Sequence, residues 1–200
     1  MIKIQDDIEK YVEYSHYIDG NDLGIQSKAK ELKDSAQNEI DLVRNTYVFV
    51  RDEIKHSWDI QDTRVTITAS DVWKEKVGIC WAKANLLAAL LRANHIPAGI
   101  CYQRLTLGDT PESGYCIHAL NAVYLKTLDK WIRLDARGNK EGINAEFSVD
   151  KEKLAFPIRT EYDEIDYGIV YAEPLPMTMK ILEKSTDALD MYIHSLPERI

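Results

Sequence analysis

The stretch from Gly78 to Arg92 constrains the fold more than any other part of the chain. Gly78 and Ile79 are followed by Cys80 and then by a run of residues dominated by Ala, Leu, Lys and Arg, which are good helix formers. Apolar residues recur on every side of this helix, which is typical of a helix surrounded by other elements. We therefore predict a buried central helix that begins at Cys80.

The position of Cys80 gives its thiol a chemical context. At a helix N-terminus, backbone N–H groups without intrahelical acceptors converge with the positive end of the helix dipole. This environment favours a thiolate and offers hydrogen-bond donors to an oxyanion. A buried cysteine is nevertheless most often a small hydrophobic residue, so a catalytic role requires a base and a group that orients the base.

Two segments downstream supply such groups. Residues 117–125 and 131–135 alternate in the manner of strands, and a turn at 126–130 would make them antiparallel neighbours. Alternation places His118 on one face with Cys116 and Leu120. Asp135 then lies opposite a residue between positions 118 and 122, within reach of His118. We expect the central helix to pack on this face and to bring Cys80 to His118.

These motifs together resemble those of the transglutaminase-like superfamily, in a stand-alone protein of the bacterial type. They are Gly-Ile-Cys-Trp at the helix start, Leu-Leu-Arg-Ala-Asn-His-Ile-Pro-Ala at its end, and then a strand His and a strand Asp in that order. The likeness covers about residues 40–140. It implies an α+β fold with a papain-like core, whose central helix packs on an antiparallel sheet. It also implies a catalytic triad of Cys80, His118 and Asp135.

The resemblance leaves the second oxyanion donor unassigned. Papain-like enzymes place a glutamine shortly before the cysteine, whereas residues 74–77 here read Lys-Glu-Lys-Val. Transglutaminases can use the indole of an upstream tryptophan, which makes Trp58 and Trp73 candidates, although each is more often a core aromatic in such a position. Asp135 is followed by Ala-Arg-Gly-Asn rather than the Asp-Pro-Thr common in the superfamily, which alters the wall of the cleft.

Further residues are candidates for the wall of a substrate cleft: Tyr102, Gln103, Arg104 and Arg137. Arg137 could instead pair with an internal carboxylate. His56, which follows an amphipathic helix predicted for residues 39–55, is expected to be a surface group stabilised by the helix dipole. Cys101 is expected to be a core residue.

The remaining patterns predict a single domain over residues 1–200, with a core at about 40–140 and helical extensions at both ends. Ser27 is a plausible N-cap for a helix that extends to about residue 37. A short strand is expected at 65–68, a strand at 100–105, a mobile loop at 107–115, a strap at 147–157 and a last strand at 167–171. One helix is expected after Pro176, ending near Pro197.

Composition excludes several classes of partner. The formal net charge of −8 argues against a nucleic acid or an acidic membrane, because both need clustered Lys and Arg. The first residues lack the apolar stretch of a secretion signal, and no apolar run approaches membrane-spanning length. Three cysteines without a Cys-x-x-Cys motif fit a reducing compartment. We therefore expect a cytoplasmic protein.

The expected reaction is attack of a thiolate on the amide of a peptide or protein, giving a thioester. Resolution by water makes the protein a peptidase or amidase, and resolution by a lysine amine makes it a transglutaminase. Hydrolysis is favoured by family analogy, because the chain lacks the extra domains and calcium loops of animal transglutaminases. A non-catalytic binding module is a further alternative. So is a zinc site built from Cys116 and His118, with Cys80 opposite, but we expect no metal or cofactor.

Overall fold

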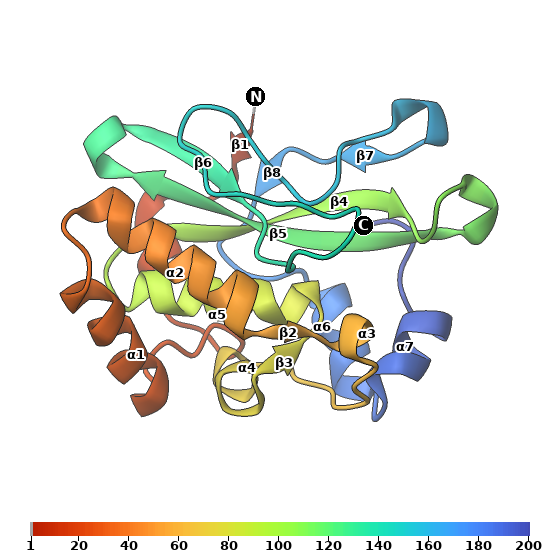
Figure 1. Cartoon of the computed structure of the whole chain (residues 1–200), viewed down its shortest axis with the longest axis horizontal. Coiled ribbons are helices and arrows are strands. Elements are labelled where there is room, and N and C mark those ends of the chain that lie inside the picture. Colours follow the sequence, from red (N-terminus) through yellow and green to blue (C-terminus); the bar gives the residue numbers. More distant parts are fainter. Residues whose placement is uncertain (1) are drawn as a thin grey trace.

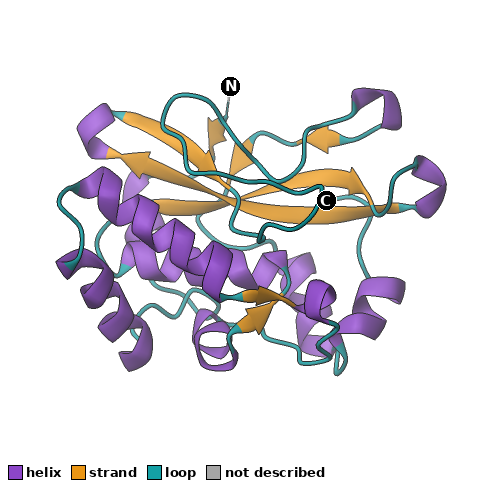
Figure 2. Ribbon diagram, viewed as in Figure 1, coloured by secondary structure: helices purple, strands orange, loops and turns teal. Residues whose placement is uncertain are grey.

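A computed structural model describes residues 2–200 and is built around one helix and one antiparallel sheet (Figures 1 and 2). The helix, α5, spans Cys80–Arg92, as the sequence predicts. The sheet has the strand order β6-β5-β4-β7, with β6 at Lys130–Leu134, β5 at Tyr115–Leu125, β4 at Ala98–Thr106 and β7 at Ile165–Asp166. The helices form a layer beneath this sheet in Figure 1. The α+β class and papain-like core predicted from sequence are thus present.

The other elements surround this centre. They are the strands β1 (Lys3–Ile4), β2 (Lys55–His56), β3 (Val77–Gly78) and β8 (Ile169–Val170), the helices α1 (Leu23–Asp34), α2 (Glu39–Glu53), α3 (Ser57–Ile60), α4 (Ala69–Glu75), α6 (Pro176–Lys184) and α7 (Ala188–His194), and the 3-10 turns η1 (Ile8–Val12), η2 (Pro111–Ser113), η3 (Lys126–Leu128) and η4 (Thr160–Tyr162). β1 pairs with β8 and β2 with β3, each in parallel.

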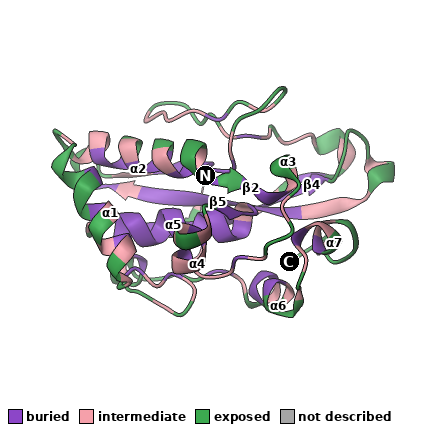
Figure 3. Cartoon of the chain, turned by 60° about the horizontal axis from the view of Figure 1, so that its bottom comes forward, coloured by how far each residue is buried: buried purple, intermediate pink, exposed green. Residues whose placement is uncertain are grey.

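Helix α5 is buried on every side, as its all-round apolar sequence predicts. Leu86, Leu87, Leu90 and Leu91 are each fully buried. Figure 3 shows α5 buried through its length, whereas α1 and α2 each expose one face. The chain leaves the helix through a left-handed residue, His95 (φ 59°), a conformation common just after a helix end.

The central helix packs on the face of β5 opposite to the predicted one. Ile117, Ala119 and Val123 share a core with the leucines of α5. Leu120, on the His118 face, belongs to a second core with Cys101, on the far side of the sheet. Alternation groups residues by face correctly, but it does not say which face a helix will cover.

Several local predictions hold and several need correction. The helix predicted at 39–55 is confirmed as α2. The preceding helix begins earlier than predicted, because Asp22 rather than Ser27 accepts hydrogen bonds from the first backbone N–H groups. Residues 65–68 form no strand; there Thr66 Oγ1 donates to the Val77 carbonyl instead. The C-terminal segment forms two helices, because Asp187 caps a new one.

Among residues 2–200, no helix combines the length and the apolar character needed to cross a membrane.

Candidate active site

Cys80 is the first residue of α5 and is partly exposed. Ile79, which precedes it, supplies no side-chain acceptor to the helix N-terminus. The first backbone N–H groups of the helix therefore have no intrahelical acceptor and no cap. The following residue fixes this end of the helix to the sheet, since the Trp81 indole N–H donates to the Ile117 carbonyl at 2.8 Å. The result is a thiol held beside β5 at the positive end of a helix dipole.

His118 and Asp135 meet on the same side of the sheet. Asn121 on β5 pairs with Leu134 on β6, so the next residue, Asp135, comes opposite Leu120, inside the expected range. His118 Nε2 lies 2.8 Å from Asp135 Oδ2, and the two side chains are 5% and 0% exposed. Backbone N–H groups of Arg137 and Ala155 also donate to this carboxylate, each at 3.1 Å.

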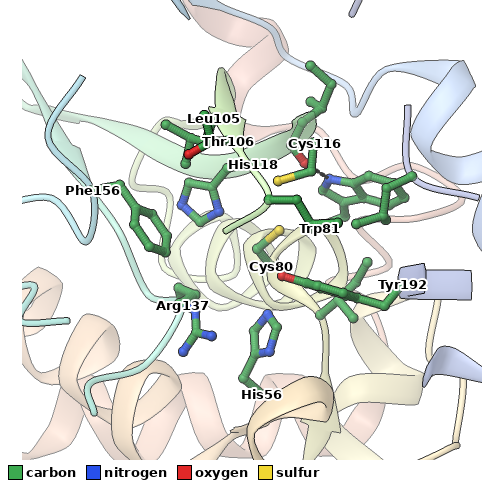
Figure 4. Close-up of a pocket in the computed structure, with 14 residues that line it drawn as sticks. His56, Cys80, Trp81, Leu105, Thr106, Cys116, His118, Arg137, Phe156 and Tyr192 are labelled. Atoms are coloured by element: carbon green, nitrogen blue, oxygen red, sulfur yellow. Dashed lines mark hydrogen bonds between the residues drawn. The ribbon is translucent and has the colours of Figure 1, made fainter. Parts of the chain in front are cut away.

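The Nε2 contact leaves Nδ1 of His118 as the ring nitrogen available to Cys80, whose sulfur lies next to the ring in Figure 4. Burial alone would lower the pKa of His118, but the charges and hydrogen bonds of Asp135 and Cys80 raise it to about 10. Burial alone would raise the pKa of Asp135, but His118 and the two backbone N–H groups lower it. Both shifts favour an imidazolium beside a carboxylate at neutral pH.

Cys80 and His118 reach each other although α5 lies against the other face of the strand. In Figure 4 the helix is seen nearly end-on behind the pocket, and His118 and Cys116 project in front of its N-terminus. Ile117, Ala119 and Val123 of β5 thus pack on the body of the helix, while Cys116 and His118, together with Ile117, line the space before its first turn.

This space is a pocket of about 70 Å³. Its polar and aromatic lining residues are His56, Cys80, Trp81, Thr106, Cys116, His118, Arg137, Phe156 and Tyr192. Cys116 thus lines the same pocket as Cys80. Burial raises the pKa of the Cys116 thiol to about 12, and burial does the same for Cys101, which is a core residue as expected.

A cluster of charges forms one wall beside the triad. The guanidinium of Arg137 pairs with Asp59 on α3, and Lys140 reaches the same carboxylate at 2.8 Å. Lys83 is buried beneath this wall, where it donates to the backbone carbonyls of Ile54 and Arg137. Burial lowers the pKa of Lys83 to about 7. These contacts fix the loop that follows Asp135, and Arg137 both lines the pocket and pairs with a carboxylate.

The structure separates the two tryptophans proposed as oxyanion donors. Trp58 on α3 stacks on Tyr192 at 4.5 Å between ring centroids and lines an adjoining hollow with Phe156. Trp73 on α4 packs with Phe49 and lies beneath the Lys76 ammonium, away from the pocket.

The other candidate wall residues lie on β4, behind the pocket. Tyr102 is buried, and its hydroxyl accepts from the Leu175 N–H at 2.8 Å. Gln103 is buried opposite His118 in the strand register, and its Oε1 has no partner among residues 2–200. Arg104 lies over the Tyr115 ring. None of the three contributes to the pocket lining.

The lining residues that were not among the candidate site residues include His56, Phe156 and Tyr192. His56 is buried rather than on the surface, because the two-residue strand β2 turns it inward beside β3. Phe156 comes from the strap and lies edge-on to the His118 ring at 5.1 Å. Tyr192 comes from α7. A strand pairing of only two residues, such as that of β2 with β3, gives no periodic signal in the sequence. The position of α7 depends on tertiary contacts, which a local sequence pattern does not show either.

Across residues 2–200, no group of three or more His, Cys, Asp or Glu side chains has the arrangement of a metal site.

Comparisons with known proteins agree with this architecture. The crystal structure of a provisionally assigned cysteine protease from Cytophaga hutchinsonii superposes with a TM-score of 0.53 at 24% identity, over 66% of this chain and 43% of the other. The periplasmic domain of TgpA from Pseudomonas aeruginosa superposes with a TM-score of 0.49 at 19% identity, over 66% of this chain and 48% of the other. The chain thus spans less than half the length of either structure. None of the curated proteins compared matches it.

The family model of the transglutaminase-like superfamily matches residues 26–136, more than half of the chain. This span includes α5, β4, β5, β6 and all three residues Cys80, His118 and Asp135. The chain therefore belongs to the transglutaminase-like superfamily.

Proposed function

We propose that the protein is a cysteine-dependent hydrolase that cleaves an amide bond in a peptide or protein. One observation carries the proposal: the His118 ring is held by Asp135 at 2.8 Å and has its other nitrogen available to Cys80 at a helix N-terminus. Nucleophile, base and orienting group are the parts that covalent catalysis by a cysteine requires. The pocket in front of them leaves room for a substrate carbonyl.

In the proposed acylation step, the Cys80 sulfur attacks the carbonyl carbon of the amide, and the π electrons move to the oxygen. The resulting tetrahedral oxyanion collapses as the C–N bond breaks, and Nδ1–H of His118 gives its proton to the leaving amine. The product is a thioester. Asp135 accepts the Nε2–H bond throughout, which fixes the tautomer and stabilises the imidazolium.

In the deacylation step, a water oxygen attacks the thioester carbonyl while neutral Nδ1 of His118 takes its proton. The C–S bond then breaks and returns the thiolate. A primary amine in place of water would give a new amide, so the same site supports transglutaminase activity as the alternative. A binding module with an unreactive site is the third candidate.

The decisive experiment offers blocked glutamine peptides to the full chain, with and without a small primary amine, and follows the products by mass spectrometry. We expect backbone cleavage or deamidation that is lost in Cys80→Ala and unaffected by the amine. Incorporation of the amine in preference to water would assign a transglutaminase. Absence of any product that depends on Cys80 would favour the binding module.

A further inference from the structure

The backbone N–H of Cys80, at the uncapped start of α5, can donate to the oxyanion of the proposed mechanism, and acyl-transfer sites hold such an oxygen with more than one donor. Neither tryptophan proposed from the sequence opens into the Cys80 pocket. Trp58 faces the adjoining hollow and Trp73 packs elsewhere. A side-chain donor for this oxygen would therefore come from another residue that lines the pocket.

His56 lies beside the approach to the nucleophile. It ends the short strand β2, whose partner β3 leads directly into α5. In the parallel register His56 pairs with Gly78, which precedes Cys80 by two residues. Figure 4 shows the His56 ring directed into the pocket toward Cys80, on the opposite side from His118. The pairing thus places the backbone of His56 beside the segment that leads into the helix.

The hydrogen bonding of His56 is incomplete. The side chain is buried, with the residue only 4% exposed, and Nδ1 is enclosed without a partner among residues 2–200. A proton on the enclosed Nδ1 would be a buried donor without an acceptor, at a cost of about 1–3 kcal/mol, which favours the tautomer that carries its proton on Nε2. Since Nδ1 is enclosed, Nε2 is the ring nitrogen open to the pocket.

The surroundings of His56 keep the ring neutral. Burial and, next, the positive charge of Arg137 lower the pKa of His56 well below 6.5, and Asp59 opposes this only in part. Lys83 and His118 add to the lowering. A neutral imidazole carries one N–H, and in the Nε2–H tautomer this donor points into the pocket. A His56 ring that keeps this proton on Nε2 would not compete with His118 as the base.

We infer that the Nε2–H of His56 is the second donor to the oxyanion on the substrate carbonyl, together with the backbone N–H of Cys80. The inference rests on the proposed function. The two histidines then have separate roles, with His118 moving the proton and His56 stabilising the developing negative charge. Donors that already point to the position of the oxyanion need no rearrangement during the reaction, and loss of one such donor lowers the rate by roughly 10²–10³-fold.

The test compares two reactions of Cys80 in the full chain. Iodoacetamide alkylates the sulfur without forming an oxyanion, whereas p-nitrophenyl acetate acylates it through a tetrahedral oxyanion. In His56→Ala we expect an alkylation rate close to that of wild type and an acylation rate lower by roughly 10²-fold or more. His56→Gln, whose amide N–H can donate, should recover part of the acylation rate.

Two control variants separate chemistry from packing. Ser57→Ala removes a neighbouring buried hydroxyl that also lacks a partner but does not line the pocket, and it should acylate like wild type. Tyr192→Phe removes the side-chain hydroxyl that Figure 4 places beside Cys80 and so tests the competing donor; we expect its acylation rate to fall less than that of His56→Ala.

Three outcomes would overturn the inference. Wild-type acylation in His56→Ala would show that the ring is not a donor. An equal fall in alkylation and acylation would mean that His56 only supports the structure. Loss of acylation in Tyr192→Phe alone would assign the donor to the tyrosine hydroxyl. Failure of wild type to acylate would instead refute the proposed function itself, together with this inference.

Discussion

At the scale of single residues, Asp135 is held more tightly than a surface carboxylate would be. It accepts from His118 and from the N–H groups of Arg137 and Ala155. Asp135→Asn keeps the shape but removes the charge that stabilises the imidazolium and sets its tautomer. We expect turnover to fall by up to roughly 10⁴-fold while Cys80 stays open to alkylation. Asp41→Asn, on the exposed side of α2, is the matched control, and equal turnover in the two variants would remove Asp135 from the mechanism.

The raised pKa of His118 predicts a pH dependence. Amide cleavage needs a proton on Nδ1, so its rate should fall as pH rises through about 10, the pKa of His118 in the folded protein. An ester with a good leaving group needs no such proton and should not show this fall. Initial rates on both substrates between pH 6 and pH 11 make the comparison. A parallel fall for both substrates would point to unfolding or to another group.

The same shift of the His118 pKa has a consequence for stability. Because the folded state keeps a proton that the unfolded state loses near pH 6.5, the contribution of His118 to folding is complete below that pH. It is lost as pH rises through about 10. The lowered pKa of Lys83, about 7, acts in the opposite direction over part of this range. Urea unfolding of wild type would therefore show only a shallow slope there.

At the scale of elements, Trp81 joins the start of α5 to β5. Trp81→Phe removes the indole donor and leaves the Ile117 carbonyl without it, which should lower the free energy of unfolding by about 1–3 kcal/mol. Acylation should fall as well, since the helix start is no longer fixed to the strand. Trp131→Phe is the control, because the Trp131 indole makes no hydrogen bond within residues 2–200 and packs on Tyr11. Equal losses of stability and activity in the two variants would show that the indole bond has no special role.

The elements also show what the sequence can predict. The period of α2 and the composition of α5 are strong local signals, and both helices form where expected. The alternation of β5 correctly groups Cys116, His118 and Leu120. It could not reveal that α5 covers the other face, because that depends on how helix and sheet pack. The pairing of β2 with β3 is two residues long and has no periodicity, so the burial of His56 could not be predicted.

At the scale of the whole molecule, Arg92 ties the extensions to the core. It is fully buried, and its guanidinium donates to the carbonyls of Glu13, Ala98 and Ala172. Arg92→Met keeps most of the stem but leaves those carbonyls unpaired, so the free energy of unfolding should fall by at least about 2 kcal/mol. Arg44→Met, which removes an exposed ion pair with Asp41, should change it by less than about 1 kcal/mol. Similar losses in the two variants, measured by urea unfolding, would contradict this role.

Only part of the site could be predicted, because several of its residues are brought to it by the folding of the whole chain. Cys80, His118 and Asp135 carry sequence motifs, and the structure brings them together. Phe156 and Tyr192 complete the pocket from the strap and from α7. These segments carry no signal that relates them to Cys80, since their position depends on contacts across the folded chain. The three residues of the proposed triad can thus be identified in the sequence, whereas the other residues that line the pocket beside them cannot.

The central claim is that Cys80 and His118 form a working pair, and selective alkylation tests it most directly. Native protein is treated with iodoacetamide at pH 6, and each cysteine is followed by peptide mapping. We expect Cys80 to react first, because Cys101 and Cys116 have pKa values raised to about 12 by burial. In His118→Ala, labelling of Cys80 should slow markedly, because the imidazolium is gone. Slow and equal labelling of all three cysteines, unchanged in His118→Ala, would contradict the account.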